Sequence, residues 1–175
     1  MGRPSGDRCG VPPVTACDIK LRRGVMYKKM LVPMDTSAFA ECVLDHVNEI
    51  ATARAIPEVV LMSVIEPVSS QTMAYMGPAG VKASEERAIT GALQYLEKVK
   101  NSLALEKSKV TKVVEAGPAV ETILDYIDKQ GVDIVILSSH GRSGVSRWLL
   151  GSTADKILRR SPVPVFLVPA VACRS

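Results

Sequence analysis

The chain has 175 residues, 47% of them hydrophobic, and a formal net charge of +4, which suits a single domain with its own core. Residues 1–25 hold most of that positive charge, so the rest of the chain is near neutral and no nucleic-acid interface is expected. No apolar run approaches the roughly 20 residues of a membrane span, and residues 1–25 lack a signal-peptide core. We therefore expect a cytoplasmic protein without a membrane partner.

Residues 1–25 carry Gly, Pro, Cys and Arg without periodicity, so we expect a flexible N-terminal extension there. The four cysteines are Cys9, Cys17, Cys42 and Cys173. None is paired with a His or another Cys at zinc-ligand spacing, so we expect reduced thiols and no metal site made of side chains.

The first strand is predicted over residues 28–33, which have an apolar centre and end at Pro33, a residue that cannot donate to a strand ladder. A helix is predicted from Ala38 onward, because apolar residues recur there at helical spacing. Asp35 thus lies between the end of a strand and the start of a helix, at the edge where open α/β sheets bind ligands. Its carboxylate either caps the helix or accepts hydrogen bonds from a ligand.

The second strand is predicted over residues 58–66, and Val64 near its end packs either in the core or against a flat apolar ring. Residues 67–81 mix Ser, Gly, Pro and Met, which predicts a long loop, either a lid over the site or a disordered segment. A helix over residues 82–103 is expected to turn four apolar residues inward: Ile89, Leu93, Leu96 and Val99.

The third strand, over residues 110–115, is short and bears Lys109 and Lys112, as an edge strand often does. A helix that ends at Gly131 is predicted next. Four apolar residues recur in it at helical spacing: Val120, Ile123, Leu124 and Ile127. Residues 133–137 are nearly all Val, Ile and Leu, which predicts an interior strand of a parallel sheet.

A glycine-bearing loop follows this fourth strand and leads into another helix. Gly141, Gly144 and Gly151 permit close backbone approaches, and Ser152 is the expected N-cap with Asp155 three residues on. Unpaired amides at such a helix start favour an anion such as phosphate. The alternative is a turn whose glycines are only structural.

The last apolar segment, Val163, Val165, Phe166, Leu167 and Val168, predicts a fifth strand. As the end of the sheet it either pairs with another chain or is covered by the C-terminal tail. The alternation of strands and helices predicts an α/β fold, with five parallel strands doubly wound by four helices.

The residues Ser138-Ser139-His140-Gly141, nine further residues and then Gly151-Ser152 resemble the ATP-binding signature of the universal stress protein family. That signature runs Gly, two residues, Gly, nine residues, Gly-Ser/Thr, so Ser138 replaces its first glycine. Residues 28–35 and 152–165 also resemble the family. The likeness covers Tyr27 to Pro169, which implies a domain over residues 26–170 and a tail over residues 171–175.

The resemblance implies a Rossmann-like nucleotide-binding fold with strand order 3-2-1-4-5, which brings Asp35 and the Gly141 loop together. It implies ATP, or ADP or AMP, as ligand, with Mg or Mn on the phosphates. The residues expected at adenosine are Pro33, Met34, Asp35, Val64 and Leu137. Those expected at the phosphates are Ser138, Gly141, Arg142, Ser143, Gly151, Ser152 and Thr153. It also implies a homodimer formed through the fifth strand.

Binding without fast turnover, as a nucleotide-dependent switch in the stress response, is the function that this pattern favours, because no dedicated general base is apparent. One alternative is a slow ATPase or autophosphorylating enzyme, in which Ser139, Ser143 or Ser146 accepts phosphate and His140 or Arg142 assists. The other is a dimeric interaction scaffold without nucleotide, which Ser138 in place of glycine keeps open.

Overall fold

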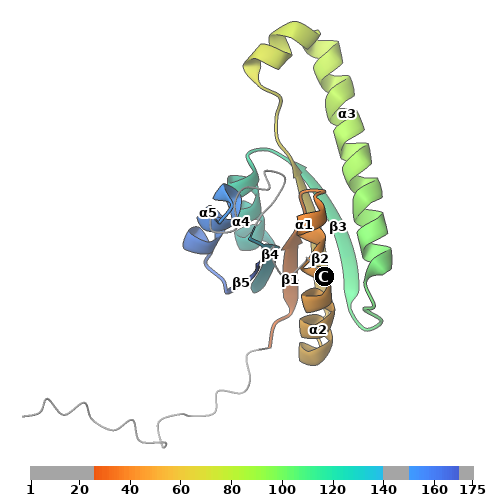
Figure 1. Ribbon diagram of the computed structural model, residues 1–175, viewed down its shortest axis with the longest axis vertical. Helices are drawn as coiled ribbons and strands as arrows, with labels where there is room; N and C mark the ends of the chain where they lie inside the picture. Colours follow the sequence, from red (N-terminus) through yellow and green to blue (C-terminus); the bar gives the residue numbers. More distant parts are fainter. Residues whose placement is uncertain (1–25, 140–149, 170–175) are drawn as a thin grey trace, which may run out of the picture.

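The computed structural model describes residues 26–139 and 150–169 (Figure 1). Its centre is a sheet of five parallel strands in the order β3-β2-β1-β4-β5. The strands are β1 (Lys29–Pro33), β2 (Glu58–Ile65), β3 (Lys109–Ala116), β4 (Ile134–Ser138) and β5 (Val165–Val168). The predicted α/β class and the strand order 3-2-1-4-5 are confirmed.

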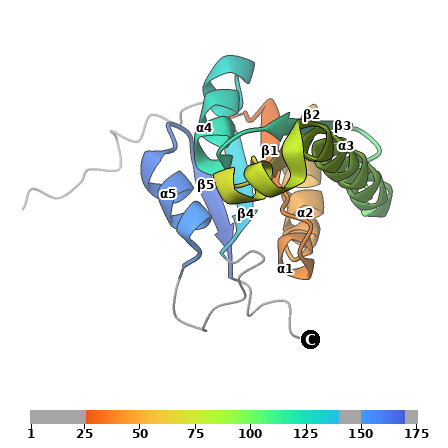
Figure 2. The same cartoon turned by 90° about the horizontal axis from the view of Figure 1, so that it is seen from above.

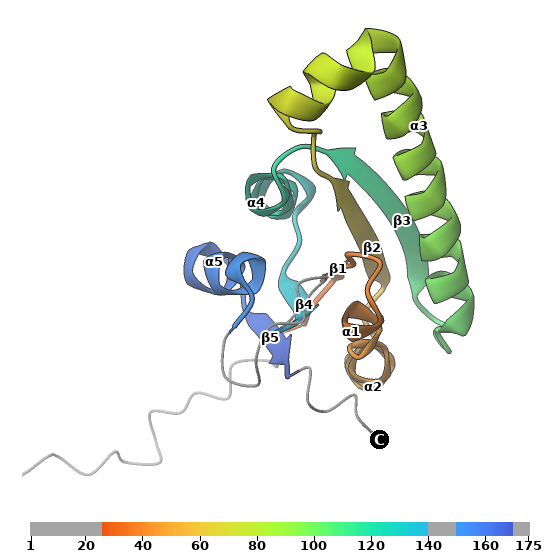
Figure 3. The same cartoon turned by 45° about the horizontal axis from the view of Figure 1, so that its top comes forward.

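The helices of the described residues are α1 (Ala38–Glu41), α2 (Leu44–Arg54), α3 (Ser70–Ser102), α4 (Ala119–Gln130) and α5 (Ser152–Arg160). Figure 3 shows α1, α2 and α3 on one face of the sheet and α4 and α5 on the other. The predicted double winding is therefore confirmed. No helix within residues 26–139 and 150–169 is both long and apolar enough to cross a membrane.

The side chains of the strands contribute to two separate hydrophobic cores, one under each layer of helices. On β1, Met30 and Val32 join the core under α2 and α3, whereas Leu31 joins the core under α4 and α5. Every residue of β4 is buried, as its run of Val, Ile and Leu predicts for an interior parallel strand. Each such buried side chain stabilises the fold by about 1.5–3 kcal/mol, so the two cores together fix which strand ends lie side by side.

The predicted first helix is two helices, because α1 ends at Glu41 and α2 begins at Leu44. Its apolar stripe survives the break, since Val43, Val47 and Ala51 are all fully buried. Cys42 lies between the two helices and is disulfide-bonded, so the expectation of reduced thiols is wrong at this position.

The loop predicted over residues 67–81 is wrong, because α3 begins at Ser70. The hydroxyl of Ser69 accepts from the Thr72 amide at 3.2 Å and starts the helix, as an N-cap serine does. The helix is interrupted only at Gly77, whose backbone is non-helical (φ 66°, ψ 169°). Pro78 then begins a second helical stretch, since proline is tolerated in a first turn.

The predicted inward face of α3 is only partly right. Leu96 and Val99 are buried, but Ile89 and Leu93 are 38% and 40% exposed. Ala92 is buried instead, so the face toward the sheet follows Ala92, Leu96 and Val99, and the two exposed residues lie at the side of that face.

Two details near the C-terminus also differ from expectation. Gly151, not Ser152, is the capping residue of α5, and the Asp155 carboxylate pairs with Arg159 at 2.9 Å. The predicted Ser152 cap is therefore wrong, because Ser152 is already the first helical residue. β5 begins at Val165, later than the predicted Val163, because prolines on both sides of Val163 have no N–H to donate.

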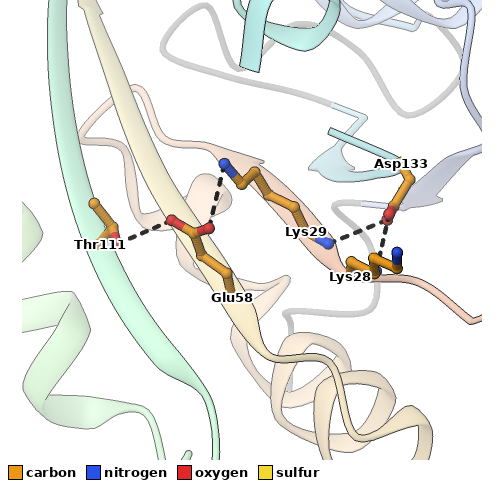
Figure 4. A network of polar contacts seen from close by, with 5 residues as sticks. All are labelled: Lys28, Lys29, Glu58, Thr111 and Asp133. Carbon is orange, nitrogen blue, oxygen red and sulfur yellow. Dashed lines mark hydrogen bonds and ion pairs between the residues drawn. The ribbon is translucent and has the colours of Figure 1, made fainter. Parts of the chain in front are cut away.

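The amino edge of the sheet is held by polar side chains (Figure 4). The Asp133 carboxylate, just before β4, accepts from the backbone amides of Lys28 and Lys29 at 2.8 and 3.3 Å. The Lys29 ammonium pairs with Glu58 of β2 at 3.2 Å, and Glu58 accepts from the Thr111 hydroxyl of β3 at 3.4 Å. Four adjacent segments are thus joined at this edge.

Candidate functional site

The registers of the three central strands place predicted site residues at one level of the carboxyl edge. β1 pairs with β2 through Pro33 and Met62, and with β4 through Met30 and Ile134. Continuing both registers beyond the strand ends puts Asp35 level with Val64 on one side and Ser139 on the other. Residues that are about a hundred positions apart in sequence therefore meet at the rim where open α/β sheets bind ligands.

Asp35 is half-buried and lies between β1 and α1. Its Oδ1 atom accepts from the Ser37 amide at 3.1 Å and from the Ser37 hydroxyl at 2.6 Å. The Ser37 hydroxyl in turn accepts from the Ala40 amide at 3.1 Å and caps α1. Asp35 is therefore not the cap itself. It orients the capping serine, and its carboxylate stays at the positive end of a short helix.

The end of β4 is fastened to both α5 and β5 through one residue. The Ser139 amide donates to the Val168 carbonyl at 2.8 Å, and the Ser139 carbonyl accepts from the Gly151 amide at 2.8 Å. Ser138 and Ser139 are 9% and 7% exposed. The N-terminus of α5 is consequently held against the carboxyl edge, on the α4 and α5 face of the sheet.

The first turn of α5 offers backbone donors at this position. The amides of Ser152, Thr153 and Ala154 precede the first intrahelical bond, which the Asp155 amide makes to the Gly151 carbonyl at 2.9 Å. The first amides of an α-helix have no acceptor within the helix, and the Ser152 and Thr153 side chains are exposed. Together with the helix dipole, this arrangement favours an anion with several oxygens.

Apolar side chains lie beside these polar groups. Leu137 is buried in the core under α4 and α5, and Val64 packs against the same core while half-exposed. Met34 behaves differently, because its side chain is 2% exposed within the core of the opposite face, under α1 to α3. Only the backbone of Met34 is at the rim, where its amide donates to the Met62 carbonyl at 2.7 Å. Pro33, one residue earlier, is half-buried.

Three of the predicted phosphate-binding residues, Gly141, Arg142 and Ser143, lie outside the described residues. His140 and Ser146, considered for phosphoryl transfer, lie outside them as well. Within residues 26–139 and 150–169, no group of three or more His, Cys, Asp or Glu side chains is placed to hold a metal ion.

Sequence reasoning missed two buried hydroxyls close to this rim. Ser63 of β2 is 1% exposed, and its hydroxyl has no hydrogen-bond partner in the described part of the chain. The hydroxyl of Tyr95 on α3 is also buried. Burial raises the pKa of Tyr95, and the nearby Glu41 and Asp35 carboxylates raise it further. Tyr95 therefore stays neutral beside Asp35. Its place within an apolar helical stretch gave no signal that it approaches the site.

Residues 26–169 match the family model described as the universal stress protein family. The chain belongs to the universal stress protein family. Universal stress protein MJ0577 of Methanocaldococcus jannaschii is 33% identical over 156 residues, which cover 82% of this chain and 96% of the relative. Universal stress protein A homolog 2 of Coxiella burnetii is 30% identical over 142 residues, covering 81% and 94%.

Solved structures of universal stress proteins share the fold. The structure of MJ0577 has a TM-score of 0.72 at 32% identity and covers 83% of this chain and 97% of its own. A universal stress protein in complex with cAMP has a TM-score of 0.58 at 18% identity, covering 83% and 98%. A family protein from Arabidopsis thaliana with AMP bound has a TM-score of 0.57 at 13% identity, covering 81% and 91%.

Proposed function

We propose that this universal stress protein binds ATP at the carboxyl edge of the sheet and acts in the cytoplasm as a nucleotide-dependent switch in the stress response. The observation that carries the proposal is the convergence of Asp35, Val64 and the Ser139 to Gly151 junction at one level of that edge. Adenine nucleotides in two proteins of the same fold, cAMP in one and AMP in the other, support it.

The chemistry of the rim fits the parts of such a ligand. A carboxylate at Asp35 accepts hydrogen bonds from ribose hydroxyls or from the adenine amino group. The apolar side chains of Val64 and Leu137 suit the faces of a flat ring, and Pro33 and Met34 supply the neighbouring backbone. The amides and hydroxyls of Ser152 and Thr153 suit phosphate oxygens, beside Ser138 and Gly151. Mg or Mn would neutralise the phosphates.

Gly141, Arg142 and Ser143 complete the proposed phosphate site by resemblance to the family signature. The residues in this site bind and orient, and they do not include an evident base for water or a hydroxyl. We therefore propose binding rather than rapid hydrolysis as the main activity.

Ser139 supplies the connection that a switch needs. Its carbonyl holds the start of α5, where the phosphates would bind, and its amide holds β5. A ligand that shifts the N-terminus of α5 therefore acts through one residue on the strand at the end of the sheet. The nucleotide would act as a switch if it bound one arrangement of this junction more tightly than another.

We propose that the chain is a homodimer formed through β5. Among the described strands, β5 pairs only with β4, and no described strand lies along its other edge. Phe166 on β5 is 41% exposed and packs on the His46 ring at a centroid distance of 5.5 Å. The half-buried Val165 and Leu167, with Val163 before them, add to an apolar edge that suits isologous pairing, whereas the Val168 side chain is buried in the core. Size-exclusion chromatography with light scattering tests it, and a Phe166→Glu variant should be monomeric.

The test of nucleotide binding begins with the protein as purified. Denaturation should release an adenine nucleotide, identified by chromatography and mass, and calorimetry of emptied protein with MgATP should show one site per chain. Asp133→Asn, at the opposite edge, is the control variant and should bind equally. Absence of both bound nucleotide and any thermal shift with MgATP would contradict the proposal and favour a scaffold. Release of labelled phosphate well above background would indicate the slow enzyme instead.

A further inference from the structure

The first part of α3, residues 70–77, is a helical segment without a core of its own. Met73, Tyr75 and Met76 are 48%, 93% and 36% exposed, and none of residues 70–77 is buried. Short helices are marginal in water and are normally held by an apolar face packed on something else. An exposed segment of this kind therefore has an apolar surface available for contact.

This segment lies beyond the carboxyl ends of the strands. Figures 1 and 3 show the yellow first part of α3 standing clear of the sheet on the side where β2 ends. Figure 2, seen from above, shows it crossing over the sheet between α4 and the rest of α3. The segment thus forms a roof over the rim that carries Asp35, Val64 and Ser139.

The roof is joined to the rest of the molecule by a pivot at each end. Residues 66–69 are neither helix nor strand. At the other end Gly77 adopts φ 66° and ψ 169°, a combination that is essentially restricted to glycine. Nothing lies within 4 Å of the position that a Cβ would take on Gly77, so the backbone alone, not crowding, demands glycine here.

The second part of α3 is fixed by comparison. Ala92, Leu96 and Val99 bury it against the sheet, and Glu97 pairs with Lys112 of β3. Between the two parts is a cavity of about 530 Å³, with Met73 and Ala74 on the roof side and Val81 on the fixed side. A pivoting movement of the roof would therefore be confined to residues 66–77. The surface that faces the cavity is largely apolar, with Lys82 and Glu85 on the fixed side.

We propose that residues 70–77 are a helical lid that pivots at Gly77 and closes over the nucleotide, with Met73 contacting the base or ribose. The proposal rests on the nucleotide site proposed above. Closing places the apolar face of the lid on the ligand and excludes water from the rim. An unbranched methionine adapts to the shape that it meets, and lid closure of this kind sets the rate at which a ligand leaves.

Amide hydrogen exchange and nucleotide dissociation rates test the lid in the full chain. MgATP should slow exchange in residues 70–77 about tenfold. Gly77→Ala should release the nucleotide about three to ten times faster, because alanine disfavours the kink that holds the roof over the rim. The matched control is Gly91→Ala, a helical glycine of α3 with nothing within 4 Å of its Cβ position, and its dissociation rate should stay as in the parent.

A second pair of variants tests the contact without touching the backbone. Met73→Gln should also speed release about threefold or more through lost apolar burial, whereas Tyr75→Gln, at the most exposed position, should not. If calorimetry shows bound nucleotide while exchange in residues 70–77 and all four dissociation rates are unchanged, the lid is wrong and the binding site stands. If neither the parent protein nor any variant binds nucleotide, both proposals fail.

Discussion

The two edges of this sheet are built in opposite ways. At the amino edge, the side chains of Asp133, Lys29 and Glu58 hold four segments together across the sheet. At the carboxyl edge, backbone atoms make the bonds between segments, those of Ser139 and the bond from Met34 to Met62, and the Asp35 carboxylate accepts from Ser37. The difference teaches that side chains join the segments at one edge, whereas backbone atoms join them at the other, where we propose that the nucleotide binds.

Substituting Asp35 by Ala should have the largest effect on binding. Loss of a carboxylate that accepts hydrogen bonds from the ligand costs about 2–3 kcal/mol, which is a fall in ATP affinity of roughly 30- to 100-fold. Isothermal titration calorimetry measures it. Chemical unfolding should show a loss of only about 1 kcal/mol, that of the bonds to Ser37. A variant that binds ATP like the parent would remove Asp35 from the site.

Substituting Asp133 by Ala is the mirror experiment at the amino edge. Two backbone amides, those of Lys28 and Lys29, lose a charged acceptor, so the free energy of unfolding should fall by about 2 kcal/mol. Urea denaturation measures the loss. The ATP affinity of the folded variant should match the parent. If affinity fell as much as stability, the separation between the two edges would be mistaken.

Breaking the Lys29 to Glu58 pair should have a smaller effect. The two side chains are 21% and 28% exposed, so solvent screens the pair only in part, and the loss in Lys29→Met is about 1 kcal/mol, the upper end of the range for surface pairs. A double-mutant cycle with Glu58→Gln, read by urea unfolding, isolates the pair from the hydrogen bond of Glu58 to Thr111. A coupling energy of zero would show that the Lys29 to Glu58 pair does not help to hold this edge.

The smallest effect is expected at Glu97, which ties the fixed part of α3 to β3. Its bond to the Lys112 ammonium lowers the pKa of Glu97. The resulting stabilisation is full above the unfolded-state pKa of about 4.3 and is lost as the pH falls through the lower folded-state value. Glu97→Gln should therefore unfold at a lower temperature than the parent at pH 7. The two melting curves should converge at acidic pH, and parallel curves down to pH 2 would contradict the assignment.

Much of the fold was predictable because its signals are local. The runs of Val, Ile and Leu in β2 and β4, and the glycine that ends α4, each specify an element through their own neighbours. The failures came where two local signals compete. Gly77 and Pro78 predicted a loop, yet capping at Ser69 and good helix formers beyond Pro78 confine the break to one residue.

The candidate site was predictable to a different degree. The position of Asp35 between a strand and a helix follows from the sequence, as does the helix start near Gly151. The core position of Met34 and the approach of Tyr95 do not. Both depend on which face of a neighbouring element is turned inward. For Met34, which follows the end of a strand, the sequence has no periodic pattern that would reveal this face.

By itself, the sequence determined the order of the elements and the apolar strands, because these depend on side chains within a few residues of one another. Only the tertiary structure decided that Asp35, Val64 and Ser139 share one level, and that the roof of α3 stands over them. Strand register is set by filling two cores at once, on both faces of the sheet. Filling both cores depends on residues that are far apart in the sequence, so no single stretch of the chain specifies the register.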